Sequence, residues 1–285
     1  MSYRNPRTEL AVSELGVLLR EWRNVRGKSQ IDLSLDSSVS QRHLSFIERG
    51  RSTPSRDTLV ALAEALDIPL RDRNSLFLAA GYAPIYSEKD WNAIEMRSLT
   101  QALQRSLRQH DPFPALVMDR YWNVLMTNDS TPRLFNAFID MAARKGPRNL
   151  LHLMFDPHGM RPFVKDWENV ARSLIQRVYR ESVGRVVDEK TKQLLAELLN
   201  YPDVKAEWRY PAISSIAAYA PVITYGFLWK ERVLNYFSMI TTVGSPAAVA
   251  AQELRIECMF PVDEETEASH AAVMDLLPIR QPNLE

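Results

Sequence analysis

The sequence of 285 residues is 46% apolar and 25% charged, values typical of a globular chain with one large domain or two ordinary ones. Its 35 basic side chains balance 35 acidic ones, and this formal net charge of zero excludes a general binder of polyanions. A single cysteine, Cys258, excludes an internal disulfide and argues against a structural thiolate–metal site.

The sequence also argues against secretion and against a membrane span. Its N-terminal stretch carries no apolar core of a signal peptide. The uncharged stretch 210–229 contains Pro211, Pro221 and Gly226, which favours a buried loop and strand over a spanning helix of ~20 apolar residues. We therefore expect a cytoplasmic protein that does not enter a membrane.

Helix signals follow one another from the start of the chain. Residues 13–26 carry apolar side chains at helical spacing, which predicts a first helix. Ser29 with Asp32 resembles a capping box and begins a second helix. Ser40 caps a third helix that ends at Gly50.

Two more helices complete the first domain. Ser55 begins a fourth helix, and Pro69 begins a fifth that stops at Gly81. These signals predict a compact all-α domain of five helices over residues 1–80, followed by a linker over 81–90.

The pattern becomes mixed in the second part of the chain. A helix over 91–109 is followed by a predicted hairpin, in which 115–119 pairs with 122–127. Further helices are expected at 129–142, 161–182 and 188–199, and further strands at 219–230, 232–243 and 252–260. This order predicts an α+β domain over 91–278, an antiparallel sheet flanked by helices, and a tail over 279–285.

The third helix presents side chains suited to reading DNA. Gln41 and Arg42 follow its cap, and their side chains can each form two hydrogen bonds, to adenine and guanine respectively. The segment 39–56 holds four arginines against Glu48 alone, a local charge of +3 on a neutral chain. Because polar residues after a helix cap are common, the alternative is a helical bundle that contacts proteins.

Residues 13–80 resemble the five-helix DNA-binding domain of Xre-type, phage-repressor-like regulators. The resemblance rests on Gln30 at the start of the second helix, Arg23 seven residues before it, and Glu48 near the end of the third. It implies that Arg23 and Glu48 form a structural pair and that Gln30 braces a phosphate and a neighbouring side chain. With Arg51 interpreted as a phosphate contact, the expected DNA-binding residues are Gln30, Ser40, Gln41, Arg42, Ser45 and Arg51.

Two residues depart from the Xre-type pattern. Ser34 replaces the usual small residue, and Ser38 replaces the usual glycine of the turn. A serine in left-handed geometry costs on the order of 1 kcal/mol, which weakens the turn without removing the reading face. Because one such module buries a modest interface, we expect a homodimer on a pseudo-palindromic operator in double-stranded DNA.

Residues from about 91 to 263 resemble the ligand-binding domain of MmyB-type regulators, a PAS-like sheet wrapped by helices. The segments 114–128 and 149–167 carry this resemblance, and 219–243 does so more loosely. The residues that mark it are Pro114, Asp119, Trp122, Asn128, Phe155, Pro157 and Trp167. The resemblance implies a buried cavity for a small hydrophobic or amphipathic ligand resembling a fatty acid.

Aromatic side chains are abundant in this part of the chain and give the candidates for the pocket. For any one of them, a place in the ordinary core is the stronger interpretation. The candidates are Trp122, Phe135, Phe138, Phe155, Trp167, Tyr225, Phe227 and Phe237.

An enzyme is the remote alternative. His152, Asp156 and His158 are close in sequence, but they span a loop without a clear fourth metal ligand. The chain has no G-x-S-x-G elbow, no phosphate-binding glycine loop and no H-E-x-x-H motif. We therefore expect no catalytic residue, no metal and no cofactor, apart from a possible bound lipid.

The sequence as a whole favours a bacterial one-component transcription regulator, with an N-terminal DNA reader and a C-terminal sensor that controls a homodimer. The alternative is a DNA-binding regulator whose second domain dimerises and binds no ligand.

Overall fold

A computed structural model describes residues 6–89, 91, 93–183, 189–210 and 224–276. The chain forms two compact units, which are described one at a time. The first comprises residues up to 90 with two later segments, 180–183 and Ser245–Gln252, and the second comprises the remainder. Every helix within these described ranges is too short or too polar to cross a membrane.

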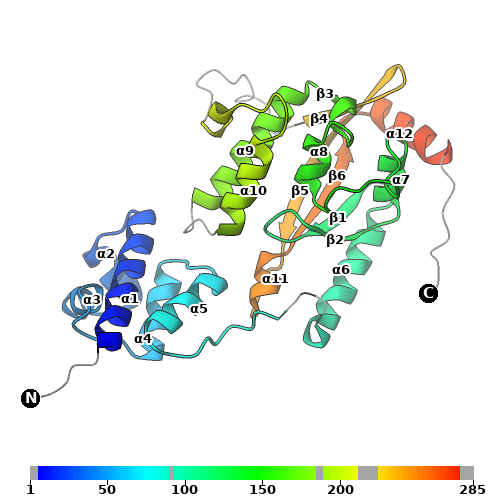
Figure 1. Cartoon of the computed structure of the whole chain (residues 1–285). Helices are drawn as coiled ribbons and strands as arrows, with labels where there is room; N and C mark the ends of the chain where they lie inside the picture. Colours follow the sequence, from blue (N-terminus) through cyan, green and yellow to red (C-terminus); the bar gives the residue numbers. More distant parts are fainter. Residues whose placement is uncertain (1–5, 90, 92, 184–188, 211–223, 277–285) are drawn as a thin grey trace, which may run out of the picture. The chain divides into compact units, whose positions relative to one another are not determined.

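The first unit contains the five helices that the sequence predicts (Figure 1, blue to cyan). They are α1 (Pro6–Val25), α2 (Gln30–Ser37), α3 (Gln41–Glu48), α4 (Arg56–Ala65) and α5 (Leu70–Ala79). Ser29 forms the expected capping box with Asp32, and the Ser40 and Ser55 hydroxyls cap α3 and α4. α1 begins earlier than expected, with Pro6 at its first position, where proline is tolerated.

The core of the first unit joins all five helices. Its fully buried side chains, each at most 1% exposed, include Leu15, Leu19, Trp22, Leu33, Leu44, Ile47, Leu59, Leu62 and Phe77. α1 and α3 approach so closely that a Cβ atom on Gly16 would lie 2.5 Å from the Glu48 carbonyl oxygen. Gly16 is therefore required for this helix contact.

A segment from late in the sequence also belongs to the first unit. It contains most of α11 (Val249–Glu253), a helix that the sequence did not predict. The Gln252 side-chain oxygen accepts a hydrogen bond of 2.7 Å from the Leu70 N–H, at the start of α5. Pro69 precedes that N–H and supplies no side-chain cap of its own, so Gln252 takes the role of a cap. The Val249 N–H donates to the Ser87 carbonyl at 3.0 Å.

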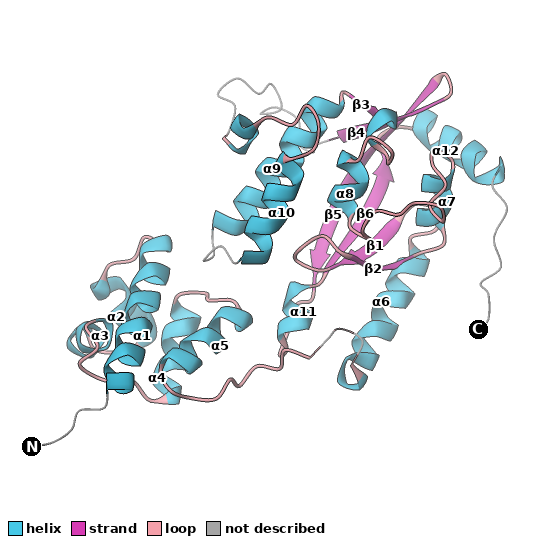
Figure 2. Ribbon diagram, in the orientation of Figure 1, coloured by secondary structure: helices cyan, strands magenta, loops and turns pink. Residues whose placement is uncertain are grey.

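The second unit contains a six-stranded antiparallel sheet with helices beside it (Figure 2). The strand order is β2-β1-β6-β5-β4-β3. The strands are β1 (Ala115–Met118), β2 (Val124–Thr127), β3 (Val164–Lys165), β4 (Thr224–Trp229), β5 (Arg232–Thr242) and β6 (Arg255–Pro261). The predicted hairpin is present as β1 and β2, and the α+β expectation is confirmed. The part of the expected strand 219–230 before Thr224 lies outside the described residues.

The helices of the second unit follow the sequence less closely. They are α6 (Arg97–Gln109), α7 (Ser130–Asn136), α8 (Leu150–Phe155), α9 (Trp167–Val183), α10 (Glu189–Leu199) and α12 (Glu264–Leu276), with short 3-10 turns η1 (Ile94–Met96), η2 (Arg161–Phe163) and η3 (Ala206–Arg209). The expected single helix over 161–182 is wrong at its start, where η2 and β3 precede α9. Asp166 has a φ of 52°, a left-handed conformation that separates β3 from α9.

Helices α8 and α12 were not predicted, each for a physical reason. Residues 151–155 of α8 are all buried, so the helix has no polar face to give its sequence a helical period. The acidic pair Glu264 and Glu265 forms the first turn of α12, where the positive end of the helix dipole favours carboxylates.

His270 on α12 is buried with both ring nitrogens bonded. Nε2 lies 2.8 Å from the Pro112 carbonyl oxygen, and Nδ1 lies 2.7 Å from the Tyr236 hydroxyl. A carbonyl only accepts, so Nε2 carries the proton and Nδ1 accepts from Tyr236. Burial holds the pKa of His270 below its ordinary value, which keeps the ring neutral.

Candidate functional sites

The start of α3 carries most of the side chains that the sequence assigns to DNA. The Ser40 hydroxyl accepts a hydrogen bond of 3.3 Å from the His43 N–H and so caps the helix. Gln41 and Arg42, directly inside the cap, are exposed, and Ser45 one turn later is half-buried. These residues lie at the helix end that meets base edges in helix-turn-helix proteins.

Glu48, at the other end of α3, holds the first three helices together. Its side chain is 2% exposed and accepts two hydrogen bonds from Arg23, Nε to Oε1 at 2.8 Å and Nη2 to Oε2 at 3.1 Å. Gln30 Nε2 donates to Oε2 at 2.9 Å. Burial alone would raise the pKa of the Glu48 carboxyl, but the hydrogen bonds from Arg23 and Gln30 outweigh it and lower the pKa. This network fixes α3 against α1 and α2.

The turn before α3 and the loop after it complete this surface. Ser38 has a φ of 58°, the left-handed geometry expected for that position. Arg51, after the helix, is exposed, and its N–H donates to the Phe46 carbonyl at 2.7 Å. The surface therefore offers two exposed arginines to a polyanion, Arg42 in the first turn of α3 and Arg51 in the loop after the helix.

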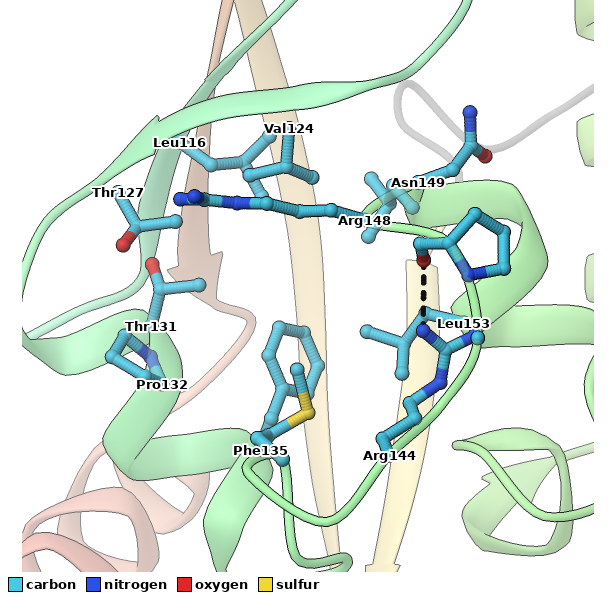
Figure 3. A pocket seen from close by; sticks show the side chains of 14 residues that line it. Leu116, Val124, Thr127, Thr131, Pro132, Phe135, Arg144, Arg148, Asn149 and Leu153 are labelled. Carbon is cyan, nitrogen blue, oxygen red and sulfur yellow. Dashed lines mark hydrogen bonds between the residues drawn. The ribbon is translucent and has the colours of Figure 1, made fainter.

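The second unit contains a cavity of about 340 Å³. Its walls come from β1, β2, α7, α8 and the loop between the two helices (Figure 3). Most of the lining is apolar, from Leu116, Val124, Pro132, Phe135, Met141, Pro147, Leu150 and Leu153, and the polar lining includes Thr127, Thr131, Arg144, Arg148 and Asn149. A mostly apolar cleft with a few polar groups is the usual form of a small-molecule site.

Arg144 is the unusual member of this lining, and the sequence analysis missed it. Its side chain is 10% exposed, and Nη1 donates to the Pro147 carbonyl at 2.8 Å (Figure 3). Within the described part of the chain, Arg144 Nε and Nη2 have no hydrogen-bond partner, although Nη2 lies 3.7 Å from Asp156 Oδ2. Gly146 leaves room for the guanidinium, because a Cβ atom there would collide with it. Buried donors without partners are costly, and an anionic group would satisfy them.

Arg148 is a second cation on the same cavity. It is exposed, and Figure 3 shows its side chain extending across the cavity toward Thr127. Both arginines lie shortly before the family-like segment 149–167, which contains the apolar run of α8, but their position in the sequence alone does not show that they line a cavity.

A second, smaller cavity of about 50 Å³ adjoins the first and shares Leu116, Phe135 and Leu150 with it. Four of the predicted pocket aromatics line the smaller cavity: Trp122, Phe135, Tyr225 and Phe227. Glu257, 6% exposed, lines it as well. Burial raises the pKa of Tyr225 well above its ordinary value, so its hydroxyl stays neutral.

The other four predicted aromatics line neither of these two cavities. Phe155 is fully buried in the core, edge-on to Trp167 with ring centroids 5.8 Å apart. Phe138 packs against Phe227 at 5.7 Å. Phe237 stacks on Phe260 at 5.4 Å. These contacts place the four residues in packing roles.

The residues considered for a metal-dependent enzyme, His152, Asp156 and His158, do not form a metal site in the described structure. Both ring nitrogens of His152 are engaged, by the Tyr201 hydroxyl at 2.9 Å and Glu197 at 3.1 Å. His158 is almost fully exposed. Within the described ranges, no group of three or more His, Cys, Asp or Glu side chains is arranged to hold a metal ion. Burial raises the pKa of the Cys258 thiol, which is opposite to what an activated nucleophile needs.

Two protein-family models match the chain. A helix-turn-helix model matches residues 19–72. The model of the MmyB-like transcription regulator ligand binding domain matches residues 99–272, more than half of the chain. No curated protein matches it. Both resemblances inferred from the sequence are thus confirmed, and the chain belongs to the family of regulators that carry an MmyB-like ligand-binding domain, here behind an N-terminal helix-turn-helix.

Proposed function

We propose that the protein is a sequence-specific, homodimeric DNA-binding regulator of bacterial transcription that responds to an anionic amphipathic molecule resembling a fatty acid. Because its partner is the chromosome, it acts in the cytoplasm. The buried guanidinium of Arg144, whose Nε and Nη2 form no hydrogen bond within the described residues, lies beside an apolar cavity and is the observation that carries the ligand proposal. The family match and the exposed start of α3 support the DNA-binding proposal.

The cavity favours a small ligand with an acidic head. Its volume of about 340 Å³ is near the lower end of the range for small-molecule sites. A carboxylate can accept hydrogen bonds from Nε and Nη2 of Arg144 together, a pairing that neutral head groups do not match. Arg148 adds a second positive charge, and the aliphatic chain would cover Leu116, Phe135 and Leu153.

The ligand proposal is tested by titrating the protein with decanoate and with decanol, which differ only in the head group. We expect decanoate to bind and to raise the melting temperature, and decanol to bind at least tenfold more weakly, since hydrogen bonds to charged groups contribute about 1.5–3 kcal/mol. Arg144→Gln should remove the preference for the acid, whereas Lys145→Gln, at the exposed neighbouring residue, should keep it. Equal binding of the acid and the alcohol would refute the acidic head group.

The same experiment tests the alternative, in which the second domain forms the dimer and binds no ligand. If neither compound binds and native mass spectrometry finds the purified dimer empty, that alternative holds. If the protein is a monomer at concentrations that saturate its DNA, the homodimer part of the proposal is wrong.

A further inference from the structure

Phe46 is an aromatic residue on α3 whose side chain does not pack on the core of the first unit. Its neighbours Leu44, Ile47 and Glu48 are buried, whereas Phe46 is half-buried. Among the described residues, the partly buried apolar side chains that pack on the core of the first unit do not include Phe46. The ring therefore lies on the outer surface of α3, where an aromatic residue gains little for folding.

Phe46 lies beside Arg42, one helical turn earlier. The guanidinium carbon of Arg42 is 5.5 Å from the centroid of the Phe46 ring, within the range of a cation–π contact. Arg42 forms no ion pair within the described residues, and the nearby Glu48 is committed to Arg23 and Gln30. The Phe46 ring thus restricts the conformation of the Arg42 side chain and leaves the N–H donors of its guanidinium available.

We propose that Arg42 and Phe46 read DNA as one unit. Arg42 donates two hydrogen bonds to O6 and N7 of a guanine, and the Phe46 ring contacts the methyl group of a neighbouring thymine. This inference rests on the proposed insertion of α3 into the major groove and adds to it the base step that the helix recognises.

The geometry fits neighbouring base pairs. Stacked base pairs are separated by about 3.4 Å along the duplex, and the thymine methyl projects into the major groove beside the next base edge. A ring centred 5.5 Å from the guanidinium carbon spans that step with a lateral offset. In the major groove the methyl group distinguishes thymine from the other bases, and an apolar ring can pack against it.

The test begins with in vitro selection of DNA by the full-length protein, which should give a half-site with a thymine next to a guanine. That thymine is then replaced by deoxyuridine in one half-site, which removes only the methyl group. We expect the affinity of the wild-type protein to fall about fourfold, the effect of one buried methyl group. The affinity of Phe46→Ala should be lower and insensitive to deoxyuridine.

A second variant separates the two roles of the ring. Phe46→Leu keeps an apolar side chain but removes the π face, so it should keep its sensitivity to deoxyuridine and lose part of the preference for guanine. Arg42→Ala should lose the preference for guanine altogether. These two variants keep the inference testable if Phe46→Ala proves unstable.

The possible failures are distinguishable. If selection yields no preferred sequence, the proposed function fails before the inference is reached. If the protein selects a site but the base beside the guanine is random, or if deoxyuridine leaves the wild-type affinity unchanged, the paired reading is overturned. Unchanged guanine preference in Phe46→Leu would overturn the cation–π role of the ring.

Discussion

Replacement of Glu48 by alanine should destabilise the DNA-reading unit more than any surface change in α3. The substitution removes the acceptor for Arg23 Nε and Nη2 and for Gln30 Nε2, while Arg23 Nη1 keeps its hydrogen bond to the Lys28 carbonyl. Loss of one partner of a buried ion pair costs about 3–5 kcal/mol. Because Arg23 is 13% exposed and can recover some hydration, we expect a value near the lower limit, about 3 kcal/mol. The melting temperature of a domain of this size would then fall by roughly 12–24 °C.

The pH dependence of this contribution has a definite sign. Since the folded-state pKa of Glu48 is lowered, its contribution is complete above the ordinary carboxyl pKa of 4.5 and is lost as the pH falls through the lower folded value. The experiment therefore belongs at pH 7, where the full effect is present.

Amide hydrogen exchange is the suitable assay because it reports the opening of α1, α2 and α3 within the full-length protein. Glu48→Ala should remove protection from these helices and leave β5 and β6 unchanged. The double variant Arg23→Met with Glu48→Leu should recover much of the protection, since an apolar pair can replace a buried ion pair. Unchanged protection in Glu48→Ala, or no recovery in the double variant, would show that the network does not hold the reader together.

Three further predictions concern other contacts. Gly16→Ala should cost about 1–3 kcal/mol in denaturant unfolding, because its Cβ would overlap the Glu48 carbonyl, and a cost under 0.5 kcal/mol would show that the helices can separate freely. Gln252→Ala should cost about 0.5–2 kcal/mol and speed exchange of the Leu70 amide, while an unchanged exchange rate would contradict its role as a cap of α5. The pKa of His270 is lower in the folded state than its ordinary value of 6.5, so the unfolded state binds more protons below pH 6.5 and the second unit loses stability as the pH falls toward the folded value. If a His270→Gln variant showed the same pH dependence of stability between pH 5 and 7, this prediction would be refuted.

Local signals in the sequence were sufficient to predict the five helices of the first unit, α1 to α5. The Ser29 capping box, the Ser40 cap and the apolar spacing of 13–26 each depend on residues close in sequence, and they predicted these three helices, although α1 begins at Pro6, seven residues before the predicted start. The left-handed Ser38 was also expected from its place in the turn. The proposed role of Phe46 could not be predicted from the sequence, because only the structure shows which aromatic side chains do not pack on the core.

The second unit was less predictable because its features depend on contacts between residues distant in the sequence. The buried face of α8 surrounds the helix, which removes the periodicity that identifies helices in a sequence. Arg144 becomes informative only when its burial and its unsatisfied donors are known. The first unit has one such contact as well, because the capping of α5 by Gln252 joins residues 182 positions apart and no local pattern predicts it.

The most direct test of the account is the affinity of the full-length protein for its selected operator with and without saturating decanoate. A ligand that regulates must bind the DNA-competent and DNA-incompetent states unequally, a coupling of typically 1–3 kcal/mol. We predict a change of at least fivefold in the dissociation constant for the wild-type protein and none for Arg144→Gln. An unchanged operator affinity, with decanoate shown to occupy the cavity, would contradict the central claim.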